Sequence, residues 1–267
     1  MRASTHRSRP PASPRSIVTD VWSAELLPRH AYCASYTAEA PVIGFAFDAQ
    51  RGTHAFNSDR RTDFHTRPNG LAYVPRGCDV YSRSDVGGEY LRITLSRPRD
   101  AWRSQRFSDL IDEAAIDAAH RLRRALLARD GVDVLDCERG VLILEARTAA
   151  CLQVPSSHRT SERWMTPQRL RLVDDLIEAR LDARLTVQDI ADMLGLSVGF
   201  FCRAFRTAIG QSPHDHIIDR RVARARTLLA DPALDLSSIA VASGFASHAH
   251  MTATFRKRLG VTPRELR

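Results

Sequence analysis

The sequence predicts an α+β protein with a β-rich N-terminal part and an all-α C-terminal part. Short apolar runs separated by turn residues fill residues 17–95, which is typical of an antiparallel sandwich or small barrel. Apolar residues at helical spacing follow in residues 106–152. Residues 167–267 then contain two similar segments, each with the pattern of a helix-turn-helix. The 267 residues are enough for two domains, each with its own core.

The β-rich region offers two kinds of candidate site. Its strands are expected at PVIGFAF, GTHAF, GLAYVPRG, DVYSRS and EYLRITL. Several aromatic side chains either pack in the core or line a pocket for a small organic ligand: Phe45, Phe47, Phe56, Phe64, Tyr73, Tyr81 and Tyr90. The histidines His30, His54 and His65 stand alone, whereas a metal-binding barrel needs clustered ligands. We therefore expect no metal site.

Two amphipathic helices are expected between the β-rich region and the C-terminal part. They would cover the barrel or pair with a second subunit, and both roles stay open. We place the first domain at residues 17–152, and the polar, Pro-containing residues 153–166 are expected to form an interdomain linker. Residues 1–16 are rich in Arg, Ser and Pro and lack the apolar stretch of a secretory signal, so a disordered basic lead-in is expected.

The net charge of +8 is unevenly placed. Residues 1–16 carry four Arg and no acid, residues 17–166 carry 20 basic and 20 acidic residues, and residues 167–267 carry 15 basic and 11 acidic residues. A basic C-terminal part indicates nucleic acid as a partner. No run approaches the ~18 apolar residues of a membrane span. The five scattered cysteines form no C-x-x-C pair, which favours a reducing cytoplasm over a disulfide framework or a cysteine zinc site.

An internal repeat organises residues 167–267. IADMLGLSVGFFCRAFRTAIGQSP, from Ile190, aligns with IAVASGFASHAHMTATFRKRLGVTP, from Ile239. The coincidences, with one extra residue in the second copy, include the pairs Gly195/Gly244, Ser197/Ser247, Phe205/Phe255, Arg206/Arg256, Gly210/Gly260 and Pro213/Pro263. A period of about fifty residues with this many matches indicates a duplicated structural unit.

Local signals place the helices of each unit. Thr186 and Asp189 have the spacing of a capping box, and Ser197 is positioned to cap the next helix. Gly210 is expected to end that helix in the left-handed conformation. Asp235 is expected to cap the first helix of the second copy, and Pro167 to begin the domain at a first helical position.

The face of each second helix opposite its apolar stripe is the candidate DNA-binding surface. In the first copy it presents Val198, Gly199, Cys202, Arg203 and Arg206, and in the second His248, Ala249, Thr252, Ala253 and Arg256. Small side chains permit close approach to a groove, polar ones reach base edges, and Arg meets phosphates. An ordinary solvated face is the alternative, and the matched repetition favours DNA.

A longer helix at 213–232 is expected to hold the two units about one helical turn of DNA (~34 Å) apart. Its apolar side carries Ile217, Ile218, Val222, Ala225 and Leu229, and its basic side Arg220, Arg221, Arg224 and Arg226. His248 and His250 point about 200° apart on a helix, so they cannot share a metal ion. His248 belongs to the groove face, and His250 is expected to pack at the helix flank.

Residues 167–267 resemble the DNA-binding domain of the AraC/XylS family of bacterial transcription regulators. The resemblance rests on both repeats, the RRVARARTLL segment between them and the terminal GVTPRELR, all in order. It implies one domain that binds two adjacent major-groove sites. Ala253 stands where the family often has Arg, and His250 and Met251 stand where aromatics are usual, so the second unit is expected to read fewer bases. GLAYVPRGCDVY resembles a strand-turn-strand of the cupin-like sensor domain that precedes this module in the family.

The sequence therefore predicts a cytoplasmic, sequence-specific regulator that binds double-stranded promoter DNA. We expect a homodimer that responds to a small-molecule effector and acts with RNA polymerase, without cofactor, metal or catalytic residues; activation or repression stays open. A metal-dependent cupin-type enzyme fused to a DNA-binding module is the alternative, but this sequence lacks the clustered metal ligands that such an enzyme needs. A DNA-repair methyl acceptor is a third hypothesis, which the scattered cysteines disfavour.

Overall fold

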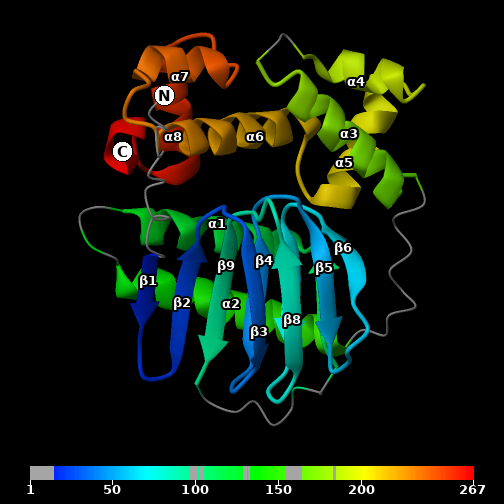
Figure 1. The fold of residues 1–267 in the computed structure, drawn as a ribbon, viewed down its shortest axis with the longest axis vertical. Coiled ribbons are helices and arrows are strands. Elements are labelled where there is room, and N and C mark those ends of the chain that lie inside the picture. Colours follow the sequence, from blue (N-terminus) through cyan, green and yellow to red (C-terminus); the bar gives the residue numbers. More distant parts are fainter. Residues whose placement is uncertain are drawn as a thin grey trace, which may run out of the picture.

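The protein has a β-rich lower part and a helical upper part in a computed structural model (Figure 1). The structure describes residues 15–96, 102, 105–128, 131, 133–153, 164–182 and 185–267. We call residues 15–153 the β-domain and residues 164–267 the helical domain. Most of the expected lead-in and most of the expected linker lie outside the described residues. The α+β fold class is confirmed.

The β-domain contains two antiparallel sheets among the described residues. The six-stranded sheet has the order β1-β2-β9-β4-β7-β10, and the four-stranded sheet the order β3-β8-β5-β6. The strands are β1 (Arg15–Val18), β2 (Trp22–Leu27), β3 (Tyr32–Thr37), β4 (Val42–Ala46), β5 (Gln50–Phe56), β6 (Thr62–Thr66), β7 (Gly70–Val74), β8 (Asp79–Ser84), β9 (Tyr90–Leu95) and β10 (Phe107–Leu110). The five strands expected from apolar runs are all present. Residues 15 and 16, expected in the lead-in, belong to β1.

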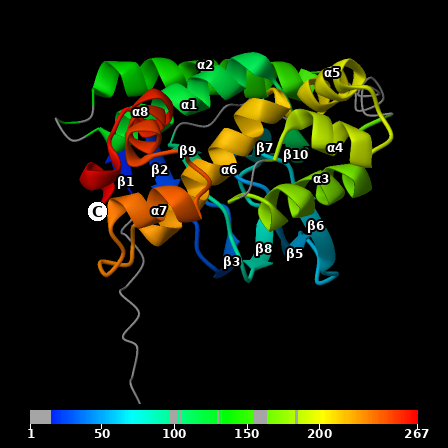
Figure 2. The ribbon, with the colours of Figure 1, turned by 90° about the horizontal axis from the view of Figure 1, so that it is seen from above.

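Helices α1 (Glu113–Leu127) and α2 (Val134–Gln153) cover one face of the six-stranded sheet. Figure 2 shows the layers in the order four-stranded sheet, six-stranded sheet, helix pair. Alternate residues of the strands, among them Ala24, Ile43 and Leu91, bury their side chains with Leu122 of α1 and Leu144 of α2. Packing within the chain therefore accounts for the inner side of both helices.

One helix boundary was predicted wrongly. Residues 107–110 were expected to begin a helix but form strand β10, which pairs with β7. The helix starts later because Asp112 is its N-cap and accepts a hydrogen bond from the amide of Ala115. Over only four residues, the spacing of the apolar side chains fits a helix and a strand equally well. Only the pairing with β7 decides between them.

The helical domain is arranged around one long helix. Its elements are α3 (Pro167–Ala179), α4 (Val187–Met193), α5 (Val198–Ile209), α6 (Pro213–Leu228), α7 (Leu236–Ala242), α8 (His248–Leu259) and the 3-10 helix Pro263–Leu266. Figure 1 shows α6 across the molecule, with α3, α4 and α5 at one end and α7 and α8 at the other. We call α4 with α5 the first unit and α7 with α8 the second unit. Among the described residues, no helix is long and apolar enough to cross a membrane.

The two units belong to different hydrophobic cores. Phe201 and Phe205 of the first unit pack with α3 residues such as Val173 in a separate cluster. Met251 and Phe255 of the second unit belong to the same cluster as the β-domain. The second unit and the β-domain therefore share one continuous core, whereas the first unit has its own.

Candidate nucleic-acid interface

Both units use the same local devices to set their helices. Thr186 and Asp189 form the predicted capping box of α4, and Asp235 caps α7 by accepting from the amides of Ser237 and Ser238. Ser197 and Ser247 are the N-caps of α5 and α8. The caps predicted from the sequence are thus confirmed, and each second helix has a defined start.

Glycines define the turn and the end of each unit. Gly195 and Gly244 have φ of 67° and 79°, and Gly210 and Gly260, after α5 and α8, have φ of 76° and 75°. This left-handed region favours glycine because a Cβ is crowded there. The turn therefore sets the angle between the helices of each unit, and the second helix ends where predicted.

The predicted groove face of α5 is open to solvent. Arg203, Arg206 and Gly199 are exposed, and Val198 and Cys202 are partly buried. A Cβ at Gly199 would lie 3.6 Å from Nη1 of Arg203, so the guanidinium lies across the position of the missing side chain. The face thus combines a small N-terminal residue with two arginines that can donate to base edges or phosphates.

The corresponding face of α8 carries weaker donors. Ala249, Ala253 and Arg256 are exposed, while His248 and Thr252 are partly buried. His248 Nε2 lies 3.3 Å from Oγ1 of Thr252, so these two polar groups already pair with each other. Arg256 is therefore the one guanidinium among the five predicted residues of this helix. His250 is exposed, and its ring meets Phe245 edge-on with centroids 5.5 Å apart.

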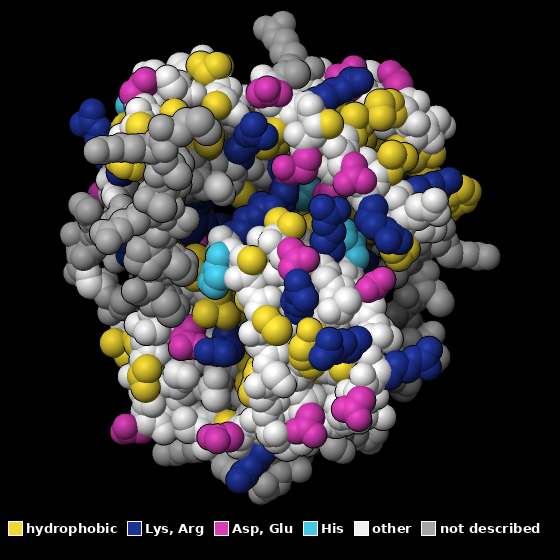
Figure 3. Space-filling view, in the orientation of Figure 1, with side chains coloured by type: hydrophobic (Ala, Val, Ile, Leu, Met, Phe, Trp, Pro, Cys, Tyr) yellow, Lys and Arg dark blue, Asp and Glu magenta, His cyan; other side chains and the backbone are white. Residues whose placement is uncertain are grey.

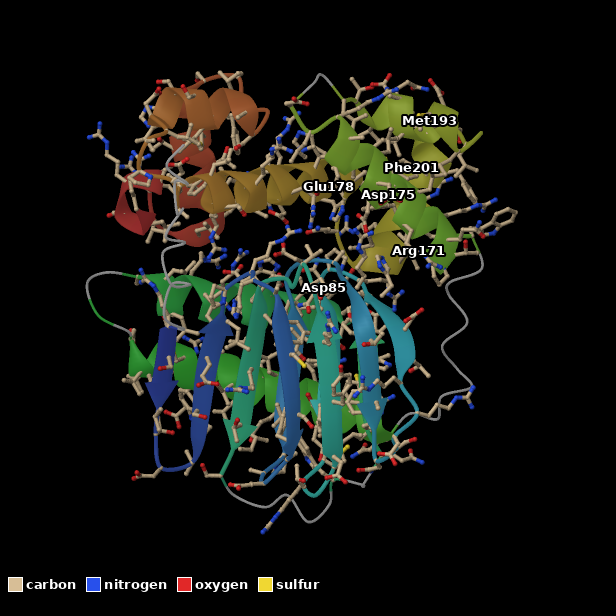
Figure 4. The ribbon with its side chains drawn as sticks, viewed as in Figure 1. Asp85, Arg171, Asp175, Glu178, Met193 and Phe201 are labelled. Carbon is tan, nitrogen blue, oxygen red and sulfur yellow. The ribbon has the colours of Figure 1, made fainter. Side chains whose placement is uncertain are left out.

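Helix α6 holds the units apart but does not present a free basic face. Its 16 residues span about 24 Å. Its predicted apolar residues are all buried. Of the predicted basic side, Arg224 is exposed, but Arg220 is buried and bonds Glu178 of α3. Figure 4 shows Glu178 on α3 near α6, with Asp175 and Arg171 on the same helix above the end of the β-domain.

A buried ionic cluster joins α6 to the β-domain. Glu89, 2% exposed, pairs with Arg123 of α1 and with Arg226 of α6, whose Nη1 lies 2.5 Å from Oε1. Burial alone would raise the pKa of Asp48, but Arg220 and neighbouring arginines hold it below its ordinary value. Arginines predicted to form a basic surface thus neutralise carboxylates of the β-domain.

A cavity of about 680 Å³ lies beside this cluster, between the β-domain, the C-terminal half of α6 and the C-terminal 3-10 helix. Figure 3 shows Lys and Arg side chains gathered at the hollow between the two domains. The cavity lining combines arginines and two acids with an apolar wall: Arg15, Arg29, Arg226, Arg267, Asp48, Glu89, Leu26, Leu127, Leu229 and Leu266. None of the seven aromatic residues suggested for a pocket lines it. Phe45, Phe47 and Tyr73 instead belong to the core cluster that includes α1 and α2.

Two further observations concern metal ligands and thiols. Among the described residues, no group of three His, Cys, Asp or Glu side chains could hold a metal ion. Burial raises the pKa of Cys78, and raises that of Cys137 to about 11. A reactive methyl-accepting thiol needs the opposite shift, towards the thiolate.

Sequence reasoning missed the residues through which the β-domain contacts the helical domain. Arg67 and Asn69 bond the end of α5, and Glu89 bonds α6. Pro68, Asn69 and Gly70 have turn chemistry, which predicts the turn but not its partner. These partners lie more than 130 positions away in the chain, and no local pattern encodes such a pairing.

Comparisons with known proteins find relatives among transcriptional regulators. A family model described as a helix-turn-helix domain matches residues 190–267. The transcriptional regulator ExsA of Pseudomonas aeruginosa is 31% identical over 225 residues, which cover 77% of this chain and 79% of ExsA. The probable transcriptional regulator LumQ of Photobacterium leiognathi is 26% identical over 118 residues, 44% of this chain, and the chain spans only 48% of LumQ. An AraC-type DNA-binding protein structure from Chromobacterium violaceum is 33% identical, with a TM-score of 0.36 over 38% of this chain and 89% of that one.

Proposed function

Because the chain belongs to the AraC/XylS family of transcriptional regulators, we propose that its helical domain binds double-stranded DNA in a sequence-specific manner. The observation that carries the proposal is the pair of matched helices, α5 and α8, held at opposite ends of α6 with their groove faces exposed. In this proposal the two helices enter successive major-groove segments on one face of the duplex.

The two helices contribute differently to recognition. Arg203 reads a base pair, because a guanidinium can donate two parallel hydrogen bonds to guanine O6 and N7. Arg206 and Arg256 contact phosphates, and Val198, Gly199 and Cys202 let α5 approach the groove closely. His248, Ala249 and Thr252 form the corresponding, less discriminating surface of α8.

Footprinting with the purified chain tests this proposal. The chain should protect two adjacent half-sites at its promoters. Arg203→Ala should cost about 1–3 kcal/mol at one defined base pair, whereas Arg256→Ala should weaken binding evenly across sequences and reduce the salt dependence. Equal losses on specific and random DNA for Arg203→Ala would refute base reading, and absence of protection at every promoter tested would refute the whole proposal.

An effector site is supported by the cavity between the β-domain and the C-terminal half of α6. A ligand there touches both domains, so binding can shift how they pack and how DNA is read. A thermal-shift screen of small metabolites should find a compound that raises the melting temperature. Arg29→Ala, which changes the cavity wall, should abolish that shift. A shift that is unchanged in this variant would place the ligand elsewhere.

A homodimer is supported by the outer side of α2, where Leu135 and Leu142 are 71% and 54% exposed. Two α2 helices packed antiparallel about Leu142 would bury this leucine of each chain against the partner helix. Leu142→Glu should convert a dimer to a monomer in sedimentation. Val18→Glu, at another exposed apolar residue, is the control. A dimer that survives Leu142→Glu would contradict this interface.

RNA polymerase is the expected functional partner, and the cytoplasm the expected location. The support is the family, whose members are transcriptional regulators. Added to purified polymerase on a template that carries the operator, the chain should raise the yield of transcript as an activator. An occupied operator with unchanged yield would contradict this part of the proposal. The proposal includes no enzymatic activity.

A further inference from the structure

Two residues of the loop between β6 and β7 bond the C-terminal end of α5. Arg67 Nη1 donates to the carbonyl oxygen of Ala208 at 3.2 Å, and Asn69 Nδ2 donates to that of Ile209 at 3.2 Å. The last carbonyls of a helix have no partner within the helix. The β-domain therefore caps the recognition helix of the first unit. We call Arg67, Asn69 and these two carbonyls the α5 clamp.

Both donors of the clamp are fixed by further hydrogen bonds. Arg67 donates from Nε to Asp109 Oδ2 at 2.7 Å, and its amide donates to Oδ1 at 2.8 Å. Asn69 is buried, and its Oδ1 lies 3.0 Å from Nε2 of His120 on α1. These contacts leave one direction for each side chain, towards α5.

The protonation state of His120 determines the orientation of the Asn69 side-chain amide. Burial, helped by nearby arginines, lowers the pKa of His120 to about 3, so the ring is neutral at neutral pH. A neutral ring can donate from Nε2 to Oδ1 of Asn69, which leaves the amide nitrogen for Ile209. His120 also contacts Phe47 beyond β4, with ring centroids 5.2 Å apart. Hydrogen bonds thus connect His120 on α1, through Asn69, to the end of α5.

The contact at the end of α5 is close. Gly210 follows the helix, and a Cβ there would overlap Ile116 and lie 3.0 Å from Cγ2 of Ile111. At the end of α8, a Cβ at Gly260 would be 3.8 Å from Arg124, an ordinary distance. The second unit is held by the shared apolar core, whereas the first is held at this end by the clamp.

We propose that Arg67 and Asn69 are positioning residues for DNA recognition, through which the β-domain sets the orientation of α5 relative to α8. This inference rests on the proposed function, since the orientation matters only if α5 enters DNA. Arg203 and Arg206 are exposed while the clamp is closed, so the clamp holds α5 with its groove face open. Loosening it adds orientational freedom that binding must remove, and weakens the first half-site selectively.

The sharpest test is Asn69→Asp in the full chain. Aspartate has nearly the same shape and keeps an acceptor for His120, but it replaces the donor to Ile209 with a second acceptor. Asn57→Asp is the matched control, because Asn57 also has positive φ, with 48° against 62° for Asn69, and lies in another loop of the β-domain. Its Oδ1 accepts from the amide of Asp79, a bond that aspartate retains.

Two readouts are needed, one without DNA and one with it. In hydrogen exchange, Asn69→Asp should speed exchange in α5 and leave α8 unchanged. In footprinting, Arg203→Ala and Arg256→Ala first identify the half-sites of α5 and α8. Asn69→Asp should then weaken binding about fivefold, the factor for one hydrogen bond of typical net strength, with the loss confined to the α5 half-site.

Several outcomes would overturn the proposal. These are unchanged exchange in α5, equal loss at both half-sites, or the same effects in Asn57→Asp. If Asn69→Asp fails to fold, Arg67→Lys provides the same two readouts, because it keeps a cation beside Asp109 but removes the guanidinium donor to Ala208. If the wild-type chain protects no DNA, the proposed function fails, while exchange in α5 still decides whether the clamp positions the helix.

Discussion

The first and second units have the same local construction and different surroundings. Each has a capped short helix, a glycine turn, a serine-capped second helix and a left-handed glycine at its end. Yet Phe205 lies in a core that belongs to the helical domain, and Phe255 lies in the core of the β-domain. Duplication of a unit therefore repeats its internal geometry and leaves its attachment free to differ.

The attachments differ in physical kind as well as in place. Apolar packing joins the second unit to α1 and to the sheets, and it requires close fit over a large surface. At the end of α5, the first unit is attached by directed hydrogen bonds from Arg67 and Asn69. Directed bonds can exchange partners at small cost, whereas a shared core cannot separate without exposing apolar surface. The first unit is thus the easier of the two to reorient.

The largest expected effect on the difference between the two units comes from truncation of their matched phenylalanines. Phe205 and Phe255 are both fully buried, so Phe205→Ala and Phe255→Ala should each cost about 4 kcal/mol of unfolding free energy. Phe255→Ala should weaken the β-domain and the second unit together, and Phe205→Ala only the first unit. Hydrogen exchange in increasing urea, followed on peptides from both domains, separates these responses.

Equal loss of protection in the β-domain for both variants would show that the chain unfolds as one cooperative block, whatever its division into clusters.

Removal of the Glu89 carboxylate should have the next largest effect. Glu89→Gln leaves Arg123 and Arg226 without their buried partner and should cost about 3 kcal/mol. Chemical denaturation measures the loss, which should fall on the β-domain and second unit. Arg83→Ala is the control, since its pair with Asp85 is exposed to solvent and should contribute far less to stability. Similar losses in both variants would mean that burial adds nothing to the Glu89 cluster.

The sequence predicted what is local and missed what is distant. The capping box at Thr186, the glycine end at Gly210 and five of the strands follow from patterns within a few residues, and all are present. The ion pairs of Arg220 and Arg226 were missed, because their carboxylate partners lie on α3 and in the β-domain. An arginine stripe on a helix looks the same in sequence whether it faces water, phosphate or glutamate.

The candidate DNA-binding surface was predictable for the same reason. On a helix with a clear apolar stripe, the stripe marks the buried face and the opposite residues are expected at the surface. Arg203 and Arg256 were therefore correctly expected to be exposed. The α5 clamp was not predictable, because the turn at Asn69 and the end of α5 are each ordinary in isolation. Their meeting depends on how two domains pack, which a single sequence does not display.

The smallest expected effect tests whether the two units are locally equivalent. Hydrogen bonds with Thr186 lower the pKa of Asp189, and hydrogen bonds with Ser238 lower that of Asp235, both from 3.8. Because the folded pKa values lie below the ordinary one, the stabilisation of α4 and α7 is fully present above pH 3.8 and is lost as the pH falls through the folded values. Carboxyl resonances followed by NMR should show both midpoints below 3.8. Asp189→Asn should remove the acid-dependent loss of stability of α4, and Asp235→Asn that of α7. The two effects should be alike although the two units belong to different hydrophobic cores. A depressed midpoint in only one unit would show that the surrounding core, and not the cap, sets the local electrostatics.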